Sequence, residues 1–190
     1  MSLRRWILAS ASPRRAQLLR ELGVDFDIIP GQAEELHPEY LTPSEICQIN
    51  AHRKARWVGH KHPDALVIGA DTVVCLDNRI FGKPATMAEA EEMLSALRGR
   101  THTVVTGVCL LELRSHRQKM FAVVTSVKFR PLEIGQIRNY LSKVDPLDKA
   151  GAYGIQEEGE LIIESISGSF SNVMGLPMER LREELAAWGK

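Results

Sequence analysis

The 190-residue chain is 44% hydrophobic and 25% charged, which is the composition of an ordinary globular protein. Its 24 basic and 24 acidic residues cancel, which argues against a nucleic-acid-binding protein with a global positive field, and no apolar run approaches the ~20 residues of a membrane span. The length suits one core, so we expect a single domain over residues 1–190. Three widely spaced cysteines without a CxxC pair predict buried free thiols and a cytoplasmic protein.

The N-terminal segment predicts an anion site. A short strand over residues 6–8 runs into Ser12 and Pro13, which suit the N-cap and first position of a helix. Arg14 and Arg15 then occupy its first turn, where cations oppose the helix dipole by ~0.3–1 kcal/mol each. A phosphate bound there, held by Ser12, Arg14 and Arg15, would reverse that cost. The alternative is two solvated arginines on an ordinary helix start.

A second strand and a long helix follow. Residues 24–28 alternate as a strand, and a polar loop carries the pair Glu34-Glu35. The capping box Thr42-Pro43-Ser44-Glu45 begins a helix that ends near Gly59. Lys54 lies beside the predicted buried stripe and, taken alone, is typical of a surface lysine. That stripe consists of Ile46, Ile49, Arg53 and Trp57.

The central stretch, Val67 to Pro84, combines an acid and a cation around a tight turn. An apolar run over residues 65–70 predicts a buried strand that ends at Asp71, and ligands of open α/β sheets bind beyond such strand ends. A hairpin through residues 77–79 leads to Lys83. The pattern predicts a site for a phosphorylated or metal-bound ligand. The alternative is that Asp71 merely ends the strand and Lys83 is solvated.

The second half of the chain alternates further helices and strands. In order, the patterns predict a helix from the cap Thr86 to Gly99, strands over 103–113 and 120–129 joined as an antiparallel hairpin, a helix over 134–141, a loop over 145–156 rich in groups that can bind, a strand over 161–166 and a helix from Pro177 to Trp188. This order predicts a mixed α/β fold.

The chain has no GxxxxGK[ST] loop, no GxGxxG after a strand and no GxSxG. Nearly end to end, it resembles instead the Maf family of nucleoside triphosphate pyrophosphatases. The motifs that carry the resemblance are Ser10 to Arg15, Glu34-Glu35, Lys54-Ala55, Gly69 to Thr72, Gly82-Lys83-Pro84, Thr101-His102 with Thr106-Gly107, and Asp148 to Gln156. The resemblance implies an elongated, twisted mixed sheet flanked by helices, with two lobes around a central cleft as in inosine triphosphatase-like proteins.

The resemblance also implies hydrolysis of nucleotides to monophosphate and pyrophosphate with a divalent metal, Mg²⁺ or Mn²⁺. Asp71 corresponds to the catalytic acid, a proton acceptor, and Glu35 to an acid near the metal, so these two carboxylates are the expected metal ligands. Which carboxylate activates water stays open. The candidates for neutralising the phosphates of the nucleotide are five cations: Arg14, Arg15, Lys54, Lys83 and Lys149.

The subgroup that prefers dTTP and UTP has Asp-Thr after the central strand and the run KAGAYGIQ, present here as Asp71-Thr72 and residues 149–156. By the same resemblance Arg14, Thr72 and Gln156 select the base. A Gln amide offers both a donor and an acceptor to the imide of uracil or thymine. The alternative for Gln156 is a loop amide satisfied by backbone.

The expected function is therefore hydrolysis of dTTP, UTP and related modified pyrimidine nucleotides, as house-cleaning of nucleotide pools with a link to cell-division arrest. One alternative is a nucleotide-binding regulator of septum formation with incidental turnover. Another is a purine pyrophosphatase of the inosine-triphosphate type. The expected partner is a small-molecule nucleotide, without nucleic acid or membrane, and a homodimer is the candidate assembly.

Overall fold

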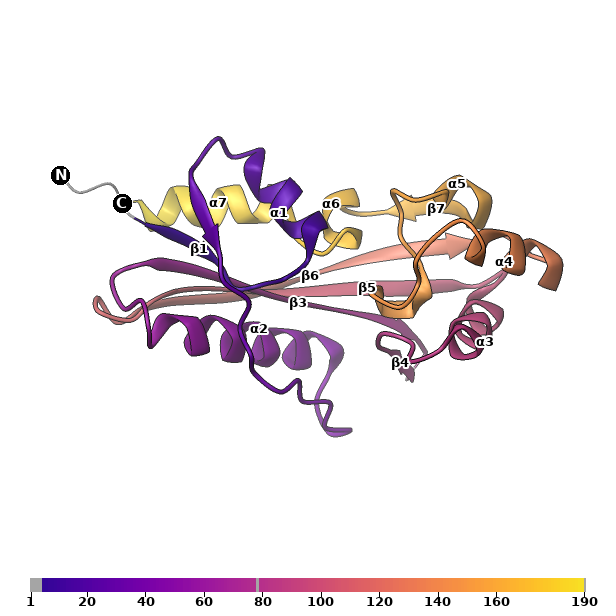
Figure 1. Ribbon diagram of the computed structural model, residues 1–190, viewed down its shortest axis with the longest axis horizontal. Coiled ribbons are helices and arrows are strands. Elements are labelled where there is room, and N and C mark those ends of the chain that lie inside the picture. Colours follow the sequence, from indigo (N-terminus) through magenta and orange to yellow (C-terminus); the bar gives the residue numbers. More distant parts are fainter. Residues whose placement is uncertain (1–4, 78, 190) are drawn as a thin grey trace. The chain divides into compact units, whose positions relative to one another are not determined.

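The computed structural model describes residues 5–77 and 79–189. In these residues seven strands form one mixed sheet in the order β2-β1-β3-β5-β6-β7, with β4 paired to β3 (Figure 1). The strands are β1 (Trp6–Leu8), β2 (Phe26–Ile28), β3 (Leu66–Leu76), β4 (Arg79–Phe81), β5 (Thr101–Glu112), β6 (Arg117–Phe129) and β7 (Ile163–Ser167). The helices are α1 (Pro13–Arg20), α2 (Pro43–Gly59), α3 (Met87–Leu97), α4 (Ile134–Leu141), the 3-10 turn η1 (Ala150–Ala152), α5 (Gly159–Ile162), α6 (Phe170–Val173) and α7 (Met178–Trp188). The predicted mixed α/β sheet flanked by helices is confirmed.

The chain divides into two compact units. Unit 1 holds the described residues up to Asp71, together with Thr106–Val123 and the segment from Gly175 onward. Unit 2 holds Thr72–Val105 and Val124–Met174. The prediction of a single domain over residues 1–190 remains a prediction.

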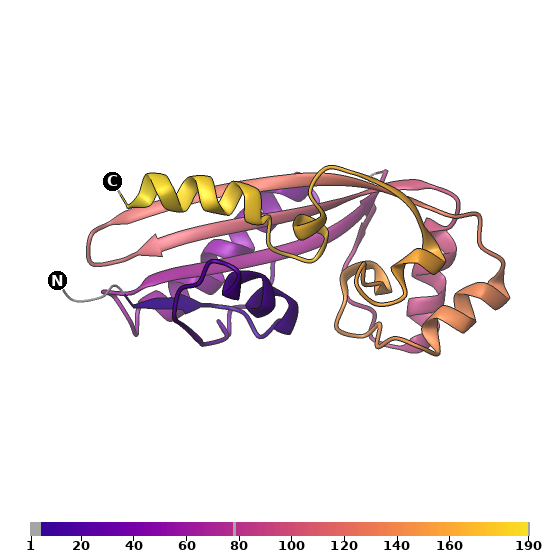
Figure 2. The same cartoon turned by 90° about the horizontal axis from the view of Figure 1, so that it is seen from above.

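Unit 1 is a sheet with helices on both faces. β1 runs parallel to both β2 and β3, with Trp6 opposite Phe26 and Leu66. Helix α2 covers one face, and α1 and α7 cover the other (Figures 1 and 2). Both helix starts anticipated from the sequence are confirmed, because Ser12 caps α1 and Thr42 with Glu45 forms the capping box of α2.

Helix α2 lies unusually close to the sheet because glycines face it. A Cβ on Gly69 would lie 2.2 Å from the carbonyl oxygen of Ala51, and one on Gly107 would lie 2.4 Å from the carbonyl carbon of Cys47. Of the predicted stripe, Ile46 is buried and Trp57 packs, partly buried, against the core, whereas Ile49 and Arg53 are not among the buried residues of the helix. Small side chains face the sheet where the backbones approach most closely. The buried residues of α2 are Ile46, Cys47, Asn50, Ala51, Ala55, Val58 and Gly59.

The prediction that this strand ends at Asp71 is wrong, because β3 continues to Leu76. The apolar run resumes after the polar pair at positions 71 and 72, so the chain stays extended and buried. Asp71 is thus a residue within a strand, and the strand-end argument for its role does not apply. The predicted hairpin is confirmed by the antiparallel pairing of Leu76 with Arg79, next to the left-handed Asp77 (φ 53°).

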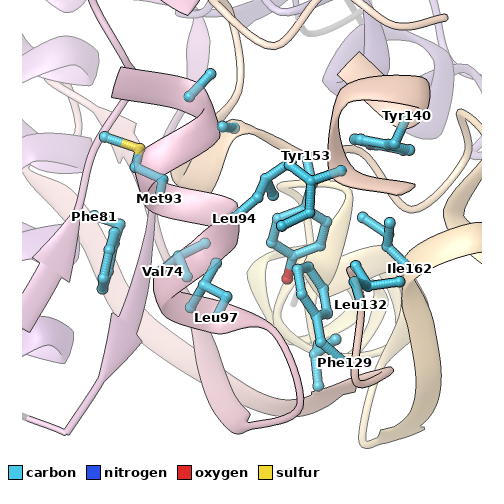
Figure 3. Close-up of a cluster of buried hydrophobic side chains, with 14 of the residues drawn as sticks. Val74, Phe81, Met93, Leu94, Leu97, Phe129, Leu132, Tyr140, Tyr153 and Ile162 are labelled. Atoms are coloured by element: carbon cyan, nitrogen blue, oxygen red, sulfur yellow. The ribbon is translucent and has the colours of Figure 1, made fainter. Parts of the chain in front are cut away.

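Unit 2 has its own core, built from the α3 and α4 helices and the strands they cover. Tyr153 packs edge-on against Phe129, with ring centroids 4.8 Å apart (Figure 3). His102 lies edge-on to both rings. The other labelled members of this cluster are Val74, Phe81, Met93, Leu94, Leu97, Leu132, Tyr140 and Ile162.

The segment from residue 159 to 173 departs from the prediction. Residues 161 and 162, predicted to begin a strand, end the short helix α5, and β7 begins at Ile163. Helix α6, capped by Ser169, was not predicted. Helices of four residues are too short to show the 3.6-residue period on which a prediction depends.

Candidate functional site

Asp71 is the centre of a polar group within unit 1. Its side chain is buried, with 4% of the residue exposed. Oδ1 accepts a hydrogen bond from Nζ of Lys54 at 2.7 Å, and Oδ2 accepts one from Nδ2 of Asn50 at 3.1 Å. Both donors come from α2, whose close approach through Gly69 brings them to β3. The carboxylate is therefore held at both oxygens, as a buried charge must be.

Lys54 bridges two carboxylates. Its ammonium lies 2.6 Å from Oε1 of Glu35 and 2.7 Å from Oδ1 of Asp71. The Glu35 side chain is 45% exposed, whereas that of Lys54 is largely covered. The structure thus brings together three residues that were far apart in the sequence. It also shows that Lys54 is not the surface lysine that its helical position alone suggested.

Arg15 holds the strand that carries Asp71. Its Nη1 donates to Oγ of Ser10 and to the carbonyl of Ala70, both at 3.0 Å, and its Nε donates to the carbonyl of Gly175 at 2.8 Å. Burial lowers the pKa of Arg15, while the charges of Asp71 and Glu35 oppose that shift. A guanidinium remains charged in proteins. Arg15 therefore supplies fixed positive charge beside the two acids while pinning the carbonyl that precedes Asp71.

The start of α1 contributes further polar residues to unit 1. Oγ of Ser12 accepts from the backbone N–H of Arg15 at 3.4 Å, and the N–H of Ser12 donates to Oγ of Ser10. Arg14, the next residue along this first turn, is half-buried. The predicted anion site thus has one arginine committed to backbone carbonyls and a second, Arg14, in the same turn.

Lys149 is the centre of a charged group within unit 2. It is buried, with 4% of the residue exposed, and its ammonium lies 2.8 Å from Asp148 and 3.0 Å from Glu157. The same ammonium donates to the carbonyl of Asp145. A Cβ on Gly154 would lie 2.9 Å from Cε of Lys149, so this glycine makes room for the lysine stem. The two carboxylates compensate the buried charge.

The loops that carry Lys83 and Gln156 meet in unit 2. The N–H of Gly151 donates to the carbonyl of Gly82 at 2.9 Å, which places the segment before Lys83 beside the loop of residues 149–156. Lys83 and Gln156 themselves are exposed. Thr72 shares a face of β3 with Val74, because side chains alternate along a strand, and the Val74 side chain contacts Gly151.

Comparison with known proteins decides the family. The family model described as Maf-like protein matches residues 5–188. The chain belongs to the Maf-like family. It is 44% identical to the dTTP/UTP pyrophosphatase of Syntrophus aciditrophicus (strain SB), covering 96% of this chain and 89% of that protein. It is 46% identical to the dTTP/UTP pyrophosphatase of Akkermansia muciniphila, covering 96% of each.

The fold is also found in a solved structure. The Staphylococcus aureus Ham1 protein superposes with a TM-score of 0.55 over 97% of this chain and 99% of that one. At 14% identity this similarity concerns the fold alone.

The carboxylates of this Maf-like protein fit a divalent cation. Glu35 and Asp71 each contact the Lys54 ammonium with one oxygen, so a cation bound by both acids would take the place of that ammonium. Mg²⁺ is commonly held by one or two carboxylates together with substrate phosphates rather than by a full protein cage. Residues 5–77 and 79–189 contain no cluster of three or more His, Cys, Asp or Glu side chains suited to a metal.

The cysteines of the Maf-like chain are buried thiols without disulfides, as predicted. Burial raises the pKa of Cys75 to about 11 and that of Cys109 to about 12, which leaves both protonated and unreactive at neutral pH. Over the described ranges, no helix has both the length and the apolar character needed to cross a membrane.

Sequence reasoning missed Asn50 and the role of Ser10. The sequence contained a signal for Asn50, because asparagine is disfavoured inside helices and both adjacent residues, Ile49 and Ala51, are apolar. A polar residue at such a position predicts a specific partner, and the partner is Asp71.

Proposed function

We propose that this Maf-like protein hydrolyses dTTP, UTP and related modified pyrimidine nucleotides to the monophosphate and pyrophosphate, as house-cleaning of nucleotide pools. The observation that carries the proposal is the buried Asp71 carboxylate, oriented by two donors beside the exposed Glu35. The substrates follow from the relatives named dTTP/UTP pyrophosphatase, which are 44–46% identical over 96% of this chain.

Asp71 and Glu35 are the residues that would hold Mg²⁺ or Mn²⁺ in unit 1. A divalent cation there would withdraw charge from the phosphate oxygens that it contacts. Asp71 acts as proton acceptor for the attacking water, because Lys54 and Asn50 hold its carboxylate in a fixed orientation. Lys54 and Arg15 place positive charge beside the two acids, and Lys54 can turn its ammonium toward a phosphate when substrate binds.

The remaining proposed contacts divide between phosphate and base. Ser12 and Arg14 at the start of α1, and Lys83 and Lys149 in unit 2, neutralise the phosphate chain. Arg14 does so bidentately, whereas the lysines act as point charges. Thr72 and Gln156, together with Arg14, select the base. Gln156 is exposed on its loop, which leaves its amide accessible to a base.

The test is a screen of UTP, dTTP, CTP, ATP, GTP and ITP with pyrophosphate detection, with and without Mn²⁺. We expect UTP and dTTP to be cleaved in preference to the others, and only with the metal present. A preference for ITP would favour the purine pyrophosphatase. Tight nucleotide binding without turnover, persisting in an Asp71→Asn variant, would favour the regulator of septum formation.

Three further points remain predictions of the same proposal. The compartment is the cytoplasm, the chain acts without nucleic acid, and the assembly is a homodimer. Fractionation of the cells, a nucleic-acid gel-shift assay and sedimentation velocity test them separately.

A further inference from the structure

Asn50 ties two segments of unit 1 together. Its side chain projects from the middle of α2, and 1% of the residue is exposed. Nδ2 donates both to Oδ2 of Asp71 at 3.1 Å and to the carbonyl of Leu36 at 3.0 Å, while Oδ1 accepts from the N–H of Leu36 at 2.8 Å. One amide therefore contacts the strand that carries Asp71 and the loop that carries Glu35.

The partners fix the orientation of this amide. The N–H of Leu36 requires an acceptor, and the Asp71 carboxylate requires a donor, so Oδ1 must face Leu36 and Nδ2 must face Asp71. Leucine has the same number of side-chain heavy atoms and a better helix propensity, and it would bury no polar atoms. Asparagine at this position is therefore explained by its hydrogen bonds rather than by packing.

We infer that Asn50 is a positioning residue for the reaction, fixing the Asp71 carboxylate and the Glu35 loop relative to each other. The terminal torsion of an aspartate is broad, so one hydrogen bond from Lys54 leaves the carboxylate free to rotate, whereas bonds at both oxygens define its plane. The backbone of Leu36, bound at both its N–H and its carbonyl, sets the place of the adjacent Glu35. This inference rests on the proposed function of Asp71 and Glu35.

Two variants distinguish the hydrogen bond that Asn50 accepts from the N–H of Leu36 from the one that it donates to Asp71. Asn50→Asp keeps an acceptor for the N–H of Leu36 but loses the donor to Asp71 and to the carbonyl of Leu36, and it places a second carboxylate beside the first. Asn50→Leu loses all three hydrogen bonds of the amide. The matched control is Gln48→Leu on the same helix, since Gln48 is half-buried and its side chain donates to the carbonyl of Ser44, away from Asp71.

The measurements are kcat and KM for UTP, together with amide hydrogen exchange at Leu36 in the nucleotide-free protein. We expect kcat to fall at least about tenfold in both Asn50 variants, the rate equivalent of a lost hydrogen bond of about 1.4 kcal/mol, with a smaller change in KM. Exchange at Leu36 should accelerate in Asn50→Leu and stay near the wild-type rate in Asn50→Asp. The control should retain the wild-type kcat.

Wild-type kcat in the folded Asn50 variants would overturn the inference, because a residue with a merely structural role changes stability without changing turnover. Unchanged exchange at Leu36 in Asn50→Leu would overturn it as well. If Asn50→Leu does not fold, the kcat of Asn50→Asp alone tests the positioning role of Asn50.

Failure of the proposed function gives a different result, namely a wild-type protein that hydrolyses no nucleoside triphosphate. The positioning role is then decided by Leu36 exchange and by urea unfolding of Asn50→Leu, Asp71→Asn and the double variant. Non-additive midpoints support a link between Asn50 and Asp71, and additive midpoints exclude it.

Discussion

Replacing Asp71 by asparagine is the sharpest test of a single residue. The change should lower kcat by about 10² or more, because it removes the proton acceptor and one metal ligand. It should also lower stability by about 1–3 kcal/mol, since an amide at this position points its NH₂ at either Lys54 or Asn50, which are both donors. The measurements are pyrophosphate release and urea unfolding. Near-normal turnover by the folded variant would contradict the role of Asp71.

Arg14→Lys keeps the charge in the first turn of α1 but replaces a planar fork by a point charge. We expect kcat/KM for UTP to fall by at least about tenfold, the value of roughly one charge-assisted hydrogen bond. The matched control is Arg20→Lys, an exposed residue in the last turn of the same helix, which should leave activity unchanged. Equal activity in all three proteins would mean that Arg14 is a solvated helix-start residue.

Gln156→Glu tests selection of the base. The carboxylate would face a carbonyl oxygen of uracil to which the amide had donated, so kcat/KM should fall more for UTP and dTTP than for CTP, by roughly ten- to hundredfold. The melting temperature should stay unchanged because Gln156 is exposed. Kinetics with the five common triphosphates provide the measurement. An equal loss for all five would exclude base selection by this residue.

At the residue scale, most residues of the proposed site could be predicted from the sequence, but the hydrogen bonds and ion pairs between them could not. Asp71, Glu35 and Lys54 could be named from motifs, because motif spacing survives in the sequence. Their mutual hydrogen bonds could not be predicted, because the sequence around Lys54 does not distinguish a lysine that bridges two carboxylates from a solvated one. Lys149 had the same ambiguity, and only the fold shows that Asp148 and Glu157 compensate its charge.

At the scale of the element, the packing of α2 on β3 is the feature that assembles the polar group around Asp71. Gly69→Ala should destabilise the protein by about 1–3 kcal/mol or more, because its Cβ would lie 2.2 Å from the carbonyl oxygen of Ala51 and backbone must move. Urea unfolding measures the loss. Gly135→Ala in α4 is the control, since a Cβ there meets nothing within 4 Å, and it should be neutral or slightly stabilising. Equal stability of the two variants would contradict this account of the packing.

The same elements show why prediction failed where it did. Caps and turns depend on a few neighbouring residues, so the starts of α1 and α2 and the hairpin at Asp77 were predicted from sequence. The buried face of α2 depends on which side chains the sheet can accept. Because α2 lies so close to the glycines of β3 and β5, only small residues fit between the helix and the sheet there. Large apolar residues such as Trp57 lie beside this contact and are only partly buried.

At the scale of the whole molecule, the order of strands and helices was enough to predict the mixed fold, and the family model extends over residues 5–188. Two lobes were expected only from the family resemblance, and the composition of the chain does not show where the two compact units divide. Strands β3, β5 and β6 each contribute residues to both units, so no linker or change of composition marks the boundary.

The stability of the molecule as a whole should depend on the protonation of one buried histidine in unit 2. His102 is buried, with Nε2 2.7 Å from the hydroxyl of Tyr153 and its ring edge-on to Phe129. Burial lowers the pKa of His102 from its ordinary 6.5 to about 4. Between these values the unfolded chain binds a proton that the folded protein does not, so the free energy of unfolding rises with pH.

The stabilising effect of neutral His102 is therefore complete above pH 6.5 and is lost as the pH falls toward 4. At about 1.4 kcal/mol per pH unit, the loss is about 3 kcal/mol. His102→Gln retains a partner for the Tyr153 hydroxyl but cannot titrate, so urea unfolding of this variant should depend less on pH across that range. Carboxylates and His52, whose pKa burial also lowers, contribute equally to both proteins and cancel in the comparison. Parallel pH dependences of wild type and His102→Gln would contradict the lowered pKa, because they would mean that His102 binds its proton equally well in the folded and the unfolded protein.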